Sequence, residues 1–171
     1  RDFTCHKKKG GGRGGFDFSR ICWNGLVEGE IKGESSCGGN GKILVANSTD
    51  TQSATPETDW ACTRDNVTGL IWSLENREGS INDIRDVALN PSKPRCGYTQ
   101  WTGPKRRQLT NILDLGYLQK DVIQTYLDKD YFPNIKTEGY WAIDSASESS
   151  HGYQMFFEAG EASVVDFCNT T

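Results

Sequence analysis

No apolar run in the chain approaches the roughly 18 to 20 residues that a membrane-crossing helix needs. The sequence also starts without a charged segment followed by an apolar one, so we expect any secretion signal to have been removed or to lie upstream. Histidine is scarce, because only His6 and His151 are present. A Ser/His/Asp catalytic arrangement would have to use one of these two, and no catalytic motif surrounds either. We therefore expect neither membrane insertion nor enzymatic activity.

The six cysteines include no C-x-x-C pair, which disfavours a zinc site, and no metal or cofactor is expected. Their even number and wide spacing instead favour three disulfides and an oxidising compartment, which places the protein outside the cell or on its surface. Spacing alone does not decide the pairing. Among the possible pairings we favour Cys22–Cys37 as a local loop, Cys62–Cys96 within the core, and Cys5–Cys168 joining the ends of the sequence.

The net charge of −4 is unevenly distributed, since residues 1–15 carry five Lys or Arg and one Asp. The remainder is acidic, which disfavours nucleic-acid binding because phosphate neutralisation needs a broad basic face. Residues 6–15 are rich in Lys and Gly and predict a mobile loop. This loop either contacts an anionic partner or is a solvated arm, and we favour the arm.

The secondary-structure pattern predicts helices in the middle of the chain and strands on both sides of them, hence an α+β fold. Residues 16–59 are polar and predict turns with one or two short strands. Further strands are predicted after the Asp65–Asn66 turn signal and in the last third of the chain, at Val67–Trp72, Tyr140–Ile143, Tyr153–Phe157 and Ser163–Phe167. Helices are predicted from Ser80 to about Pro91, from Pro104 to Leu115, and around Val122–Leu127.

Several segments in the last two-thirds of the chain resemble, in order and spacing, the C-terminal domain family of the Legionella collagen-like protein. They are Trp60–Trp72, Cys96–Tyr98, Trp101, Pro104–Leu109, Tyr131–Asn134 and Tyr140–Trp141. The resemblance covers roughly residues 60–168 and divides the chain into a loop-rich N-terminal extension, 1–59, packed on a main domain, 60–171. It implies an exported bacterial domain with a C-type-lectin-like twisted antiparallel sheet and two or three short helices.

The family resemblance also implies adhesion, because the namesake binds sulfated polysaccharides as a trimer. One motif departs from the family: the usual Trp-Arg-Leu-Pro-Thr-Arg-Lys-Glu-Leu is replaced here by Trp101-Thr-Gly-Pro-Lys-Arg-Arg-Gln-Leu109. The Trp, the Pro, the last Leu and a basic pair are kept, whereas the first Arg, the first Leu and the Glu are absent. A role for this motif does not transfer directly from the family.

The candidate ligand-binding residues begin with Lys105, Arg106 and Arg107 in the first turn of a predicted helix. The helix dipole disfavours cations at that position, so the run favours a site for sulfate or carboxylate groups of a glycan. The alternative is that nearby carboxylates neutralise these charges, with Asp114, Glu75 and Glu78 as the candidates.

Aromatic residues complete the candidate site. We expect Trp60, Trp72 and Trp141 in the core, and Tyr98 and Tyr153 exposed, where their rings can contact a sugar. An oxygen-rich group resembles a calcium-ligand set, although its spacing favours turn and helix-end carboxylates: Asp128, Asp130, Asn134 and Asp144.

The function expected from these observations is that of an extracellular bacterial adhesin or pilus-associated domain that binds a glycan or another host-surface ligand. The alternative is a structural or assembly subunit of a surface fibre, whose partners are proteins or copies of itself. A secreted polysaccharide-acting enzyme with paired carboxylates is the third reading.

Overall fold

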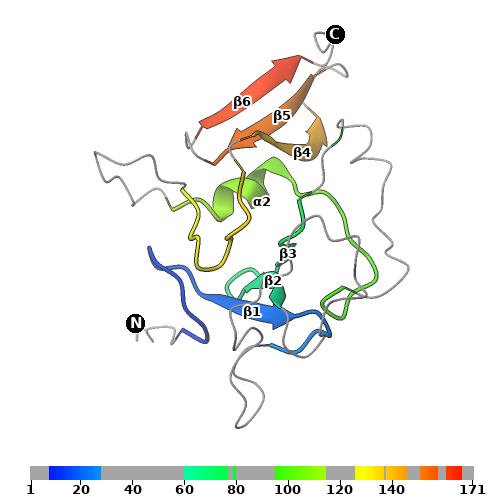
Figure 1. The fold of residues 1–171 in the computed structure, drawn as a ribbon. Coiled ribbons are helices and arrows are strands. Elements are labelled where there is room, and N and C mark those ends of the chain that lie inside the picture. Colours follow the sequence, from blue (N-terminus) through cyan, green and yellow to red (C-terminus); the bar gives the residue numbers. More distant parts are fainter. Residues whose placement is uncertain are drawn as a thin grey trace, which may run out of the picture.

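The computed structural model describes residues 8–27, 60–76, 79, 95–114, 126–136, 138–145, 151–157 and 161–166. In these ranges the chain forms two antiparallel sheets and one helix of six residues. Figure 1 shows the helix between the two sheets. The protein is therefore a small sheet-rich fold.

The first sheet joins the N-terminal part of the chain to the region that begins at Trp60. It contains β1 (Phe18–Cys22), β2 (Trp60–Asp65) and β3 (Ile71–Ser73) in the order β1-β2-β3, with both pairings antiparallel. β2 is the central strand, and five of its six residues are buried. Strand pairing thus binds residues of the predicted N-terminal extension to the first strand of the predicted main domain.

The strand predicted over Val67–Trp72 is largely wrong, because its first half forms the turn between β2 and β3. The Asp65 carboxylate accepts hydrogen bonds from the Val67 N–H at 2.9 Å and from the Thr68 hydroxyl at 2.5 Å. Gly69 has a φ of +75°, a conformation that glycine adopts without a steric penalty. The buried strand lies earlier in the sequence, at Trp60–Asp65, where the alternation of residue types is weaker.

The Gly-rich segment before β1, predicted as a mobile loop, is anchored where it is described. The buried Asp17 carboxylate accepts hydrogen bonds from the Lys9 N–H at 2.9 Å and the Gly10 N–H at 2.7 Å. Gly11 and Phe18 exchange two backbone hydrogen bonds. Hydrogen bonds to one buried carboxylate therefore hold residues whose own side chains are small or exposed.

The second sheet comes from the last third of the chain. It contains β4 (Tyr140–Ser145), β5 (His151–Phe156) and β6 (Glu161–Asp166) in the order β4-β5-β6, again antiparallel. The predicted strand at Tyr140 and the predicted C-terminal hairpin are both confirmed. The predicted turn at Ala159–Gly160 lies outside the described residues.

The helix α2 (Arg106–Asn111) is shorter than the predicted helix from Pro104 to Leu115. The Ile143 N–H donates to the Pro104 carbonyl at 2.9 Å, and Lys105 at the N-cap is extended, with φ −79° and ψ 154°. Attachment to β4 thus delays the start of the helix. The helix predicted from Ser80 to about Pro91 lies outside the described residues. Tyr126 and Leu127, from the third predicted helix, are described and are not helical.

One core cluster joins both sheets and α2. Phe18 is fully buried in it and packs edge-on against Phe132, with ring centroids 5.3 Å apart. The remaining buried members are Cys22, Trp60, Leu74, Leu109, Ile112, Leu113, Leu127, Ala142, Met155 and Phe157. Burial of apolar surface by a side chain such as Phe or Leu stabilises the fold by about 1.5–3 kcal/mol each. The two sheets consequently share one hydrophobic core in the described residues.

A second core cluster surrounds the Cys62–Cys96 disulfide, which was the pairing expected for these two cysteines. Ile21 and Ala61 complete its buried part, and Trp101 packs against it. Cys22 is also disulfide-bonded. Its expected partner Cys37 and the expected Cys5–Cys168 pair lie outside the described residues.

Candidate ligand-binding site

The start of α2 carries the three predicted basic residues, and Lys105, Arg106 and Arg107 are all exposed. Two side chains hold this turn. The Lys105 N–H donates to the Gln108 side-chain carbonyl at 2.7 Å, and the Arg106 N–H donates to the Asp144 carboxylate at 2.6 Å. These bonds satisfy two of the backbone donors that a helix start leaves unpaired, and they tie the basic turn to β4.

Arg106 is further positioned by an aromatic ring on β5. Its guanidinium carbon lies 4.4 Å from the centroid of the Tyr153 ring, a cation–π distance. Tyr153 is half-buried and packs against the main core cluster, so the ring is a fixed platform. The structure thus brings together two of the five residues predicted for the site. A planar guanidinium can bind a carboxylate or sulfate through two parallel hydrogen bonds.

The carboxylates expected to neutralise this basic run are engaged elsewhere. Asp114 is buried and forms an ion pair with Arg13, with 3.3 Å between the Asp114 Oδ2 and Arg13 Nε atoms. Glu75 pairs with Arg95. Glu78 lies outside the described residues.

Among the described carboxylates, Asp144 reaches the basic turn, where it binds the backbone of Arg106. Within the described ranges, no ion pair engages the side chains of Lys105, Arg106 or Arg107. Three exposed basic residues are thus consecutive in this turn, and one of them, Arg106, lies over an aromatic ring.

Tyr98 lies apart from this stack, on the turn Arg95–Tyr98. It is 51% exposed, and its ring meets Trp101 edge-on with centroids 6.5 Å apart. The three tryptophans expected in the core differ in burial: Trp60 is buried, whereas Trp72 and Trp141 are half-buried. Trp101 was not predicted as a partner of Tyr98, although its three-residue spacing from Tyr98 was a usable signal.

The oxygen-rich residues considered for calcium do not form one site. Asp128 is buried and accepts hydrogen bonds from the Arg13 and Asp130 N–H groups, at 2.9 and 3.0 Å. Asn134 donates to the Leu74 carbonyl, and Asp144 serves the start of α2. The described residues contain no group of three or more His, Cys, Asp or Glu that could hold a metal ion.

Two further arginines stack on aromatic rings, and both act within the fold. The Arg20 guanidinium lies 4.6 Å from the Trp60 ring centroid and donates to the Asp130 carbonyl at 3.1 Å. Arg95 lies 5.3 Å from the Trp23 ring centroid, and burial lowers the pKa of its guanidinium from the ordinary value. Arg106 differs from both, because its backbone and ring contacts leave its charge at the surface.

In the part of the chain that is described, no helix has the length and apolar character needed to cross a membrane. Comparison of the chain with protein-family models, curated proteins and solved structures finds no match.

Proposed function

We propose that this chain is an extracellular bacterial binding domain of the adhesin type, secreted or displayed at the cell surface, that recognises acidic glycans. The observation that carries the proposal is the exposed basic turn at the start of α2, with Arg106 stacked on Tyr153 and Asp144 bound to its backbone. Three basic side chains that form no ion pair within the described residues suit sulfate or carboxylate groups of a ligand. The Cys62–Cys96 disulfide supports an oxidising compartment.

Each part of the turn has a distinct role in this proposal. Arg106 supplies paired, planar donors whose direction Tyr153 fixes before the ligand arrives, which reduces the entropy lost on binding. Lys105 and Arg107 supply exposed positive charge, which accelerates association and makes it sensitive to salt. Asp144 holds the turn against the repulsion among its three cations and offsets the unfavourable helix dipole.

Binding to immobilised sulfated and neutral glycans tests the proposal directly. Arg106→Ala and Arg107→Ala should each weaken binding of the sulfated glycan several-fold, whereas Lys129→Ala removes an equal charge at another exposed position and should leave binding nearly unchanged. Tyr153→Ala should weaken binding and Tyr153→Phe should preserve it, because only the ring is needed for the stack. If Lys129→Ala and Arg107→Ala weaken the affinity for the sulfated glycan equally, binding depends only on net charge, which contradicts a defined site.

The resemblance to the Legionella collagen-like protein C-terminal domain family, and with it an α+β, C-type-lectin-like architecture, is part of the same proposal. The antiparallel sheet β4-β5-β6 packed against α2 is compatible with that architecture. An experimental structure of the whole chain with two or three short helices flanking one twisted sheet supports it. A structure with further strands in their place contradicts it.

A structural or assembly subunit of a surface fibre is the second candidate function. Its supporting observation is that Leu26 and Tyr98, on neighbouring turns, are 40% and 51% exposed. Light scattering separates the candidates: a stable oligomer weakened by Leu26→Asp favours assembly, and a monomer that binds glycans favours the adhesin.

A further inference from the structure

The turn that carries Tyr98 has an unusual backbone. The Arg95 N–H donates to the Tyr98 carbonyl at 2.8 Å, and the Tyr98 N–H donates to the Arg95 carbonyl at 2.9 Å. Both central residues have positive φ, +51° at Cys96 and +80° at Gly97, which defines a type I′ turn. Glycine adopts this conformation readily, but a positive φ is uncommon for cysteine. The turn is consequently held by the structure around it.

Three contacts hold the turn. Cys96 is fully buried and bonded to Cys62 on the central strand β2, and its N–H donates to the Trp23 carbonyl at 2.9 Å. Gly97 lies against Gly25 so closely that a Cβ added to Gly25 would be 3.0 Å from the Gly97 Cα. The turn therefore has little freedom to change the direction in which Tyr98 leaves it.

The turn presents aromatic surface next to polar surface. Half of Tyr98 is exposed, while its ring rests edge-on against Trp101, which itself packs on the cluster around the disulfide. Thr99 and Gln100 follow directly and are exposed. A fixed ring with an adjacent hydroxyl and amide offers both stacking and hydrogen bonds, which suits the apolar face and the hydroxyl groups of a sugar ring.

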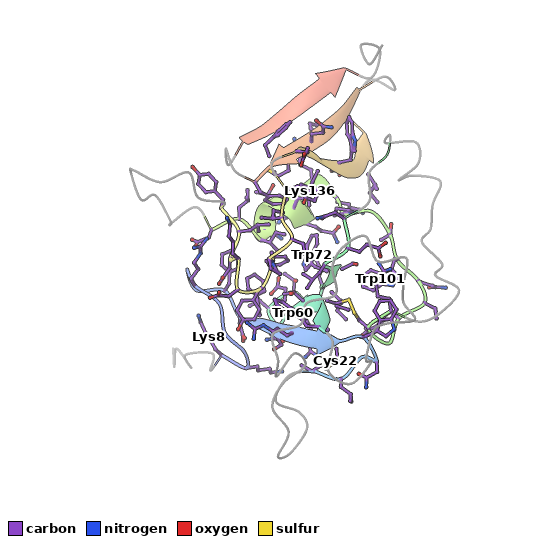
Figure 2. The ribbon with its side chains drawn as sticks, in the orientation of Figure 1. Lys8, Cys22, Trp60, Trp72, Trp101 and Lys136 are labelled. Atoms are coloured by element: carbon purple, nitrogen blue, oxygen red, sulfur yellow. A yellow bond between two sulfur atoms is a disulfide. The ribbon has the colours of Figure 1, made fainter. Side chains whose placement is uncertain are left out.

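Chain connectivity places this aromatic pair near the basic turn. Arg106 follows Trp101 by five residues, so their Cα atoms are at most about 18 Å apart even if the segment is fully extended. The Ile143 N–H binds the Pro104 carbonyl and fixes the middle of the segment to β4. Figure 1 shows the green segment leading into α2 along one side of the molecule, and Figure 2 labels Trp101 on that same side.

We propose that Tyr98 and Trp101 form a sugar-stacking subsite that continues the basic site, so that the ligand is an acidic oligosaccharide long enough to contact both. This inference rests on the proposed function at Arg106. A site with both parts should bind a chain of several sugar rings more tightly than a single charged sugar. The basic turn beside the aromatic pair favours such a polyanion over an apolar protein surface.

The test compares a heparin-derived disaccharide with a heparin-derived octasaccharide by calorimetry on the oxidised chain. Tyr98→Ala should weaken binding of the octasaccharide about fivefold or more and leave the disaccharide unchanged, because only the longer ligand reaches the ring. Tyr98→Phe should retain the affinity for the octasaccharide. Val67→Ala is the matched control, since Val67 is an exposed apolar residue, 70% exposed, on a different turn.

Wild-type amide shifts give a second readout that needs no variant. The Tyr98, Thr99 and Gln100 amide signals should move with the octasaccharide and stay in place with the disaccharide. The subsite is overturned if Tyr98→Ala leaves octasaccharide affinity unchanged and the octasaccharide does not shift these amide signals. The basic site is not affected by that result. Failure of both ligands to bind overturns the basic site and the subsite together. Loss of self-association in Tyr98→Ala without loss of glycan binding assigns Tyr98 to a protein interface and overturns the subsite.

Discussion

Removing the Cys62–Cys96 disulfide gives the most quantitative prediction for this fold. The bond joins β2 to the Arg95–Tyr98 turn across 34 residues of sequence. Closing a loop of that length restricts the unfolded chain and is worth about 4 kcal/mol in the chain-entropy model. Because a small domain has only about 5–15 kcal/mol of stability in total, Cys62→Ala with Cys96→Ala should lose a large part of it.

A second variant separates this entropic effect from the strain in the turn. Cys96 has a φ of +51°, where an alanine pays a steric penalty and a glycine does not. Cys62→Ala with Cys96→Gly should therefore be about 1 kcal/mol more stable than the double alanine variant, provided that the turn survives.

Urea unfolding followed by tryptophan fluorescence measures both differences, with the disulfide of Cys22 verified by mass spectrometry. A loss below about 1 kcal/mol in the double alanine variant would refute the loop-closure reasoning. Equal stability of the alanine and glycine variants would show that the type I′ turn depends on the disulfide for its existence. The turn would then not form without the Cys62–Cys96 bond.

Three further changes probe other contacts. Asp17→Ala should lower the free energy of unfolding by about 3 kcal/mol, because two backbone N–H groups lose a buried charged acceptor, and faster amide exchange at residues 9 and 10 reports it. Asp144→Ala should lower the free energy of unfolding by about 1 kcal/mol, because the helix start loses a cap, and should weaken binding of sulfated glycans, because Arg106 is held less firmly. Unchanged affinity would show that this cap does not contribute to the binding site. Burial, with a contribution from Glu138, raises the pKa of Tyr140 above its ordinary value near 10. The unfolded chain then loses this proton first, so stability falls as the pH rises from about 10 through the higher folded pKa, and Tyr140→Phe should flatten that fall in denaturation curves.

The sequence predicted the second sheet well and the first sheet poorly, for a physical reason. β4 and the β5–β6 hairpin are regular runs with aromatic and β-branched residues separated by turn residues, a pattern that local chemistry specifies. β2 is a central strand buried on both faces, and its Thr63 and Asp65 are buried polar residues, so alternation is absent. Its pairing with β1 spans more than thirty-five residues of sequence, which no local pattern encodes.

The anchoring of the Gly-rich segment was missed because composition does not show where a buried carboxylate lies. Lysine and glycine predict a solvated loop when taken alone. Asp17 becomes an acceptor for that loop only after β1 and the β2–β3 turn place Asn66 beside it, with 2.9 Å between the Asn66 Nδ2 and Asp17 Oδ1 atoms. Tertiary structure thus overrides the local preference.

In the candidate site, too, the sequence identifies some residues, while their partners are known only from the tertiary structure. Lys105, Arg106 and Arg107 were identified because they oppose the helix dipole, and that rule operates within one turn. Their partners Asp144 and Tyr153 come from β4 and β5, far along the sequence, and Asp144 had been grouped with possible calcium ligands instead. The sequence thus identified the charges, while the fold determines which of them is held in place.

The most direct test of the central claim is binding of the oxidised protein to sulfated and neutral glycans across a salt series. Affinity for sulfated chains should fall with rising salt and be lost when Lys105, Arg106 and Arg107 are all changed to Ala. Circular dichroism and thermal unfolding of this triple variant should remain close to those of the wild-type protein, since all three side chains are exposed. Salt-insensitive binding, or binding that the triple variant retains, would contradict an electrostatic site at the start of α2.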